Sequence, residues 1–258
     1  MELGLRGKRA LVTGGTRGIG RAIGTALLRE GAALAVCGRS AEGLRDAEAA
    51  LRTASDGAQV FGTVADVAVP EDAARFVAEA ASALGGVDLV VCNVGGTAGG
   101  WFEEAGAEDW TRTFGLNLFH SVNTIRAAVP EMRRQGGGSV VLISSISGWK
   151  PGSKAQYATA KAAEIQLAAS LAPELARDNI RVNTVSPGSI MFEGGGWARR
   201  MQAEPERMTA FLRDEFPAGR MGTVEEIADV VCFVLSERAR WINGAHIPVD
   251  GAQGRPGL

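Results

Sequence analysis

"RALVTGGTRGIG", from Arg9 to Gly20, is the segment from which the architecture can be predicted. Arg9–Thr13 is a short apolar run that predicts a β-strand, and a helical pattern follows the glycines. Gly14, Gly18 and Gly20 have a G-x-x-x-G-x-G spacing rather than the G-x-G-x-x-G of the standard dinucleotide fingerprint. Glycine permits a tight turn and close backbone approach, and the following helix offers N–H groups to a pyrophosphate. The segment predicts a dinucleotide-binding loop, with an ordinary strand–helix turn as the alternative.

Short apolar runs alternate with helix-like segments along the rest of the chain. The further expected strands are Ala33–Cys37, Gln59–Val64, Val87–Val94, Ser139–Ser144, Ile180–Ser186 and His246–Asp250. The expected helices are the one that ends near Glu30, Ala41–Thr53, Glu71–Leu84, one around Glu108–Arg134, Gln156–Arg177 and Val224–Ser236. Continuously apolar strands between helices imply a parallel sheet covered on both faces. The sequence therefore predicts one Rossmann-type, doubly wound α/β domain over residues 1–258, with seven strands and about six helices.

The composition narrows the class of protein. With 46% hydrophobic residues, the 258-residue chain can build a large core. A formal net charge of −2, from 27 basic and 29 acidic residues, argues against an electrostatic nucleic-acid binder. No apolar run approaches the roughly 18 residues of a membrane span, and the N-terminal "MELGLRGK" lacks the apolar region of a signal peptide. We therefore expect a cytoplasmic protein with neither a nucleic-acid nor a membrane partner.

Cysteine and histidine are scarce. Cys37, Cys92 and Cys232 lie far apart, each within an apolar stretch, which suits neither a zinc site nor a disulfide framework. His120 and His246 are the only histidines. We expect buried, reduced thiols and no metal site.

The end of the second expected strand bears on the choice of nicotinamide cofactor. An NAD-selective protein commonly has Asp or Glu there, which binds the ribose 2′-hydroxyl. This chain reads "VCGRS", with Gly38 and Arg39 in place of an acid. Arg39 can bind a 2′-phosphate, with help from Arg17 and the Ser40 hydroxyl, although a solvated loop arginine is the alternative. The sequence favours NADP(H) over NAD(H).

The only tyrosine of the chain, Tyr157, lies in "SSISGWKPGSKAQYATAK", four residues before Lys161. In a helix this spacing puts both side chains on one face. A tyrosine with a pKa near 10 is a poor acid–base group at neutral pH, but a nearby ammonium favours the phenolate. With a serine hydroxyl that polarises a carbonyl, such a pair suits hydride transfer between a ketone and an alcohol. A core aromatic beside a surface lysine would have the same spacing by chance.

Taken together, these motifs make the chain similar to the short-chain dehydrogenase/reductase family, classical type, over essentially its whole length. The motifs are "TGGTRGIG", "ADV" (65–67), "CNVG" (92–95), "LN" (116–117), "SSISG" with "YATAK", "SPGSI" (186–190) and "VDG" (249–251). They occur in the order and near the intervals that are typical of the family. The chain also resembles the 3-oxoacyl-(acyl carrier protein) reductases of this family, whose motifs many other members share.

The resemblance implies a role for each residue of the catalytic motif. Tyr157 would be the general acid–base, and Lys161 would hold the nicotinamide ribose and favour the tyrosine's phenolate. Ser145, 12 residues before Tyr157, matches the serine that polarises the substrate carbonyl. Ser144 and Ser147 are alternatives, because the interval in the family is often one residue longer.

The resemblance also implies a proton relay and a set of cofactor contacts. Asn117 matches the residue that links the lysine to a relay water, although a helical asparagine bonded to backbone is the alternative. The implied cofactor-binding residues are Gly14, Thr16, Arg17, Gly18, Ile19, Gly20, Arg39, Ser40, Asp66, Val67, Asn93, Gly95, Tyr157, Lys161, Pro187, Gly188, Ser189 and Ile190.

Three positions depart from the family pattern. Cys92 replaces the first Asn of an Asn-Asn-Ala-Gly stretch, which puts a sheet-stabilising hydrogen bond in doubt. Phe192 replaces a threonine that often contacts the cofactor. Pro173 lies inside the expected helix that carries Tyr157, and we predict a bend or local break near Ala169–Pro173. This helix commonly packs at a subunit interface in the family, so we expect a homo-oligomer, a tetramer or a dimer.

Substrate choice is expected to come from the loops that follow the strands. A lid at about residues 189–217 contains "FEGGGW" (192–197), whose glycines suit a hinge. The aromatic residues of these loops either line the pocket or pack within the lid and between subunits; in the first case an apolar ketone or an acyl chain is favoured over a sugar. They are Trp101, Phe102, Trp149, Phe192 and Trp197.

The expected activity is that of an NADP(H)-dependent ketone or 3-oxoacyl reductase acting on a small molecule. An acyl carrier partner would need a basic patch, to which Arg126, Arg133 and Arg134 could contribute, although a solvated helix face explains them more simply. The alternatives are an NAD-dependent alcohol or polyol dehydrogenase and a catalytically silent NADP-binding regulatory protein. The presence of both Tyr157 and Lys161 argues against the silent protein.

Overall fold

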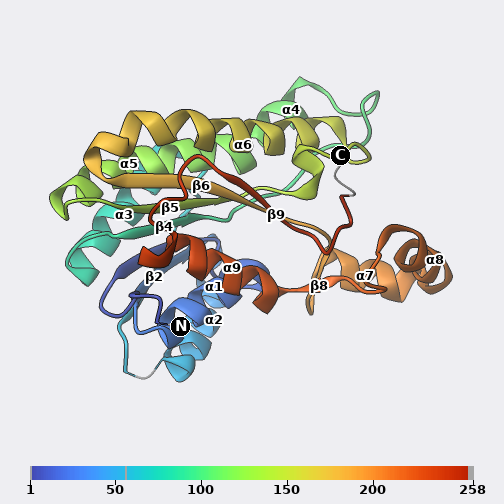
Figure 1. Cartoon of the computed structure of the whole chain (residues 1–258). Helices are drawn as coiled ribbons and strands as arrows, with labels where there is room; N and C mark the ends of the chain where they lie inside the picture. Colours follow the sequence, from blue (N-terminus) through green and yellow to red (C-terminus); the bar gives the residue numbers. More distant parts are fainter. Residues whose placement is uncertain (1, 56, 255–258) are drawn as a thin grey trace.

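Seven parallel strands form the central sheet of the computed structural model, which describes residues 2–55 and 57–254 (Figure 1). Their order is β3-β2-β1-β4-β5-β6-β9, so the predicted doubly wound sheet is confirmed. The strands are β1 (Arg9–Thr13), β2 (Ala33–Gly38), β3 (Val60–Val64), β4 (Leu89–Cys92), β5 (Gly138–Ile143), β6 (Ile180–Pro187) and β9 (His246–Val249). The direction of winding reverses between β1 and β4, and a crevice for a ligand forms at such a point beyond the carboxyl ends of the strands.

Helices cover both faces of this sheet (Figure 1). One face carries α1 (Gly18–Arg29), α2 (Ala41–Ala54) and α9 (Val224–Leu235). The other carries α3 (Pro70–Leu84), α5 (His120–Arg134) and α6 (Ala155–Leu175). The described residues also form short helical segments, namely α4 (Ala107–Phe114), a π-helix η1 (Gly115–Phe119), and the 3₁₀ turns η2 (Ile146–Gly148), η3 (Ala176–Asp178) and η4 (Glu237–Ala239).

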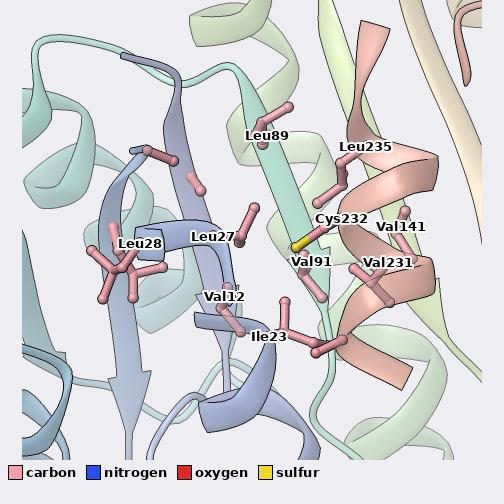
Figure 2. Packing of buried hydrophobic residues seen from close by; sticks show 14 of the residues in the cluster. Val12, Ile23, Leu27, Leu28, Leu89, Val91, Val141, Val231, Cys232 and Leu235 are labelled. Atoms are coloured by element: carbon pink, nitrogen blue, oxygen red, sulfur yellow. The ribbon is translucent and has the colours of Figure 1, made fainter. Parts of the chain in front are cut away.

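The core has one hydrophobic layer on each side of the sheet. Figure 2 shows the layer under α1 and α9, where Ile23 and Leu27 of α1 and Val231 of α9 pack over the strands. Residues on β1, β4 and β5 are buried on both faces, which explains why these strands have continuous rather than alternating apolar character. All three cysteines are free and buried in these layers, as expected. Within the described part of the chain, no helix is both long and apolar enough to cross a membrane.

The segment expected to form a lid projects from the sheet as two helices (Figure 1). They are α7 (Gly196–Ala203) and α8 (Pro205–Glu215), and a two-stranded sheet of β7 (Ile190–Met191) and β8 (Gly222–Thr223) joins them to the domain. Met208, Phe216 and Met221 form a small buried cluster of their own. This segment therefore has its own core, separate from the two layers of the main sheet.

Two helices differ from the sequence-based expectation. The helix expected around Glu108–Arg134 is divided into α4 and α5 by the π-helical turn η1. The local break predicted near Ala169–Pro173 is wrong, because α6 continues through Pro173 as far as Leu175. Since Pro173 is only two residues from the helix end, its missing N–H removes a hydrogen bond where the helical ladder is about to end.

Candidate active site

The glycine loop connects β1 to α1 and has the backbone conformation that its glycines allow. Gly14 and Gly18 have φ angles of +64° and +54°, which side-chain-bearing residues rarely adopt. A Cβ on Gly20 would lie 2.4 Å from the carbonyl oxygen of Gly14. The N-cap residue Arg17 provides no side-chain cap, and the first turn of α1 contains no acid. The uncapped N–H groups of α1 therefore suit the pyrophosphate of a dinucleotide.

The end of β4 fastens this loop to the sheet. The Thr13 hydroxyl accepts a hydrogen bond from the Asn93 N–H at 2.9 Å, and the Asn93 side-chain amide donates to the carbonyls of Thr13 (3.1 Å) and Gly14 (3.2 Å). The Asn93 side chain, predicted to line the cofactor, is therefore engaged in holding the loop. Cys92 is fully buried, and the side-chain hydrogen bonds to the loop come from Asn93, the residue after it.

Two guanidinium groups lie at the surface, Arg17 in the loop after β1 and Arg39 directly after β2. Arg17 and Arg39 are both exposed, and neither takes part in an ion pair among residues 2–55 and 57–254. The Ser40 hydroxyl accepts from the Gly43 N–H at 3.2 Å as the N-cap of α2, so its expected part in phosphate binding competes with a capping role. Asp66, two residues after β3, accepts a hydrogen bond from the Ala68 N–H at 3.2 Å.

Tyr157 and Lys161 lie in the first two turns of α6, as the spacing predicted. The Lys161 nitrogen is 5.9 Å from the centre of the Tyr157 ring. It donates to the carbonyl oxygen of Ile143 at 2.8 Å, which ties α6 to the end of β5. The tyrosine is half-buried and the lysine is buried. The alternative of a core aromatic beside a surface lysine does not describe this arrangement.

The structure separates the neighbouring serines. The Ser144 hydroxyl is buried and donates to the carbonyl oxygen of Lys161 at 2.7 Å, so its proton is already used. Ser145 is half-buried at the start of η2, and its hydroxyl accepts from the Ser147 N–H at 3.1 Å, which leaves its own proton free to donate. Of these two hydroxyls, only that of Ser145 is therefore able to donate to a substrate without losing a contact with α6.

Asn117 is fully buried in the π-helical turn, a kind of distortion that is frequent at functional sites. Its amide nitrogen donates to the carbonyls of Gly96 and Thr113, each at 2.6 Å, and its Oδ1 accepts from the Gly96 N–H at 3.3 Å. These contacts match the alternative of a helical residue bonded to backbone. A Cβ added to Gly95 would lie 3.2 Å from Asn117 Oδ1 and 3.3 Å from Lys161 Nζ. Gly95, in the loop after β4, therefore packs closely against both side chains.

Glu164 is a buried charged residue that the sequence analysis did not identify. Its side chain is fully buried on α6, and its Oε2 lies 2.8 Å from Lys161 Nζ. Gln156 was also missed; it precedes the tyrosine and donates to Ala98 O and Gly100 O, which anchors the loop after β4. The i,i+3 spacing of Lys161 and Glu164 was visible in the sequence, but most glutamates at such positions are solvated.

Four of the five loop aromatic residues fall into three groups. Trp197 stacks on Phe211 at 5.3 Å between ring centres, which places it within the lid segment. Trp149 packs edge-on to His246, and a Cβ on Gly254 would collide with its ring, so it lies against the C-terminal segment. Trp101 and Phe102 are 61% and 69% exposed, so neither is packed in the core.

The Phe192 ring occupies a different position, against the glycine loop. A Cβ added to Gly18 would lie only 2.9 Å from atoms of this ring. The residue that replaces the family's threonine is thus next to the expected pyrophosphate position. The preceding turn is held by Gln253, which accepts from the Ser189 N–H at 2.8 Å and donates to the Ser189 hydroxyl at 3.0 Å.

Known proteins resemble the chain over almost its whole length. A family model described as enoyl-(acyl carrier protein) reductase matches residues 14–252. Dehydrogenase/reductase SDR family member 4 of Bos taurus is 36% identical over 249 residues, which cover 96% of this chain and 87% of the relative.

Solved structures have the same fold at similar identity. L-Sorbose reductase of Gluconobacter frateurii, complexed with NADPH and L-sorbose, has a TM-score of 0.94 at 31% identity and covers 100% of both chains. A 7α-hydroxysteroid dehydrogenase, complexed with NADH and 7-oxo glycochenodeoxycholic acid, has a TM-score of 0.89 at 29% identity, covering 97% of this chain and 95% of that one. The likeness therefore extends to proteins solved with either nicotinamide cofactor and with different bound small molecules.

Proposed function

This chain belongs to the short-chain dehydrogenase/reductase family, and on that premise we propose that it is an NADP(H)-dependent oxidoreductase that interconverts a ketone and a secondary alcohol. The observation that carries the proposal is the arrangement at the carboxyl end of β5. There Lys161 is bonded to the Ile143 carbonyl, with the Tyr157 ring beside it and the Ser145 hydroxyl at the start of the next turn. The start of α1, which has no side-chain cap, follows β1. β1 belongs to the same sheet as β5, with β4 between them.

The proposed roles follow from these positions. A bound nicotinamide would supply or accept the hydride. Tyr157 would give its hydroxyl proton to the carbonyl oxygen during reduction and take it back during oxidation. Lys161 would favour the phenolate by its positive charge, and Ser145 would donate a hydrogen bond to the oxygen on which negative charge develops. The Gly14–Gly20 loop and the N–H groups of α1 would hold the pyrophosphate.

The preference for NADP(H) is supported by the end of β2. Gly38 and Arg39 stand where a carboxylate would repel a 2′-phosphate, and both Arg39 and Arg17 are exposed. A guanidinium binds phosphate through charge-assisted hydrogen bonds. The related L-sorbose reductase was solved with NADPH, whereas the related hydroxysteroid dehydrogenase was solved with NADH. NADH is therefore the necessary comparison in every assay.

For the substrate we propose a small ketone, apolar or with an acyl chain, taken up under the segment 189–217. Phe192 is the aromatic residue of this segment that lies next to the glycine loop. A ketose or polyol is a second candidate, because the structural match to a protein complexed with L-sorbose covers the whole of both chains. We further propose a cytoplasmic homo-oligomer, either a dimer or a tetramer.

The test uses the wild-type protein with NADPH and NADH side by side on simple ketones, diketones, 3-oxoacyl thioesters and a ketohexose. We expect oxidation of NADPH with at least one ketone. Tyr157→Phe should leave NADPH binding, measured by fluorescence titration, nearly unchanged and should lower kcat by a factor on the order of 10³. Substantial residual turnover in this variant would contradict the role of Tyr157. NADPH binding without turnover on any substrate would favour the silent regulatory protein.

A further inference from the structure

A buried carboxylate lies next to the proposed catalytic pair and has no role in the mechanism above. Glu164 is three residues after Lys161 on α6, and its side chain is 0% exposed. Its Oε2 is 2.8 Å from the Lys161 nitrogen, whose side chain is only 3% exposed. Glutamate is almost never fully buried unless it is paired. The ion pair therefore accounts for the burial of both residues.

The energetics of Lys161 depend on this neighbour. Burial lowers the pKa of Lys161, because the interior solvates an ammonium poorly. The negative charge of Glu164, with a further contribution from Tyr157, more than offsets this effect, and the pKa lies above its ordinary value. The Ile143 carbonyl accepts one hydrogen bond at 2.8 Å but supplies no countercharge. Without Glu164, the cost of burying the ammonium would be largely uncompensated.

Apart from Tyr157, whose phenolate would also favour the ammonium, the groups around the pair in the described residues do not supply a second anion. Burial lowers the pKa of His120, on α5, to about 3, so its imidazole is neutral at physiological pH. Burial raises the pKa of the Cys92 thiol, on β4, which keeps this thiol protonated. Asn117 and Ser121 are uncharged, and the Ser121 hydroxyl lies 3.5 Å from Glu164 Oε1.

We propose that Glu164 is a positioning residue for the reaction: its carboxylate holds Lys161 in the ammonium form and in the place where it supports Tyr157. The assignment rests on the proposed function, because Glu164 would act, through Lys161, on the proton transfer by Tyr157. It also explains why a lysine that is almost completely buried can act as a cation.

The ionisation of Lys161 can be measured without any substrate. The chain contains only four lysines, Lys8, Lys150, Lys154 and Lys161. Protein labelled with ¹³C at the lysine ε-carbon therefore has four signals to titrate by NMR, which Lys→Arg variants at the three other positions assign. In the wild type we expect Lys161 to remain an ammonium up to a higher pH than an unpaired buried lysine would. In Glu164→Gln, which keeps the shape but removes the charge, we expect its apparent pKa to fall by at least about one unit.

Two further variants separate charge from packing. Glu164→Asp keeps the negative charge and should retain most of the wild-type value. Glu174→Gln makes the same chemical change at an exposed position of α6 and should leave Lys161 unaffected. A Lys161 titration that is the same in Glu164→Gln and the wild type would overturn the proposal. If Glu164→Gln does not fold, the NMR titration of the wild type still tests the proposal. A Lys161 that is neutral at neutral pH in the wild type would also overturn the proposal.

The activity profile provides a second readout. A lysine is charged below its pKa, so in Glu164→Gln the cation is lost at a lower pH than in the wild type. We therefore expect kcat/KM for carbonyl reduction to begin to fall at a lower pH in this variant, by the same shift that NMR measures, while Glu164→Asp stays near the wild type. A wild type without turnover would refute the proposed function but not the NMR result; turnover without a shift of Lys161 would refute the role of Glu164 alone.

Discussion

At the scale of single residues, the proposed preference for NADP(H) depends on Arg39. Its guanidinium is exposed, follows the last residue of β2, and has no ion-pair partner in the described ranges 2–55 and 57–254. The arginine is therefore available for a charge-assisted contact with a 2′-phosphate. NADH lacks this phosphate, so a loss confined to NADPH would report the contact directly.

We expect Arg39→Ala to raise the Kd for NADPH by about ten- to a hundredfold, since a hydrogen bond to a charged group contributes about 1.5–3 kcal/mol. The Kd for NADH should change little. Fluorescence titration of both nucleotides measures the effect. Arg45→Ala removes an exposed arginine of α2 and is the matched control. An equal loss of affinity for both nucleotides in Arg39→Ala would contradict the assignment.

Two neighbouring serines after β5 have different environments. Ser144 and Ser145 are adjacent, yet one hydroxyl is bonded to the backbone of α6 and the other lies at the start of η2. Their environments differ because successive residues at the end of an extended strand point to opposite sides. The sequence interval to Tyr157 favours Ser145 but leaves Ser144 and Ser147 as alternatives.

At the scale of elements, α6 carries the proposed catalytic residues Tyr157 and Lys161 and also contains a proline. Pro173 lies inside the helix and is exposed, and the helix ends at Leu175. Proline cannot donate the hydrogen bond to the carbonyl four residues earlier, which weakens the last turns. The first turns, which carry Tyr157 and Lys161, are about three turns away and keep their contacts with β5.

We therefore expect Pro173→Ala to increase the free energy of unfolding by about 1–3 kcal/mol without a change in kcat. Urea denaturation followed by circular dichroism measures the stability. The control is Pro205→Ala, because Pro205 begins α8 at a position where no helical hydrogen bond is lost. A destabilised Pro173→Ala protein would show that the proline is required for the local structure.

At the scale of the whole molecule, one ion pair joins two strands that lie far apart in the sequence. Arg9 on β1 donates from Nε to Asp88 Oδ2 at 2.6 Å and from Nη2 to Oδ1 at 2.7 Å, just before β4 begins. Burial favours the neutral form of Asp88, but the hydrogen bonds and charge of Arg9 outweigh it, and the pKa of Asp88 lies below its ordinary value. The pair therefore stabilises the centre of the sheet at the end opposite the candidate active site.

Arg9→Met should lower the free energy of unfolding at neutral pH by about 2–3 kcal/mol, because a largely buried carboxylate loses its partner. Asp88 has a lowered pKa in the folded state, so its contribution is present above the unfolded pKa near 4 and is lost as the pH falls through the folded value. The difference between the variant and the wild type should therefore shrink in acid. Chemical denaturation at neutral and acid pH measures it, and a difference independent of pH would contradict the electrostatic explanation.

Local patterns were sufficient for the fold and for the centre of the candidate site. Strand–helix alternation depends on residues close together in sequence, and so do the turn imposed by Gly14 and Gly18 and the four-residue step from Tyr157 to Lys161. The environments of the other site residues depend on contacts between segments that lie far apart in the sequence. Ser144 bonds to Lys161, Asn93 to the loop after β1, Trp197 stacks within the lid, and Glu164 is buried against Ser121 of α5. Burial and pairing depend on the three-dimensional arrangement of these segments, which no local periodicity encodes.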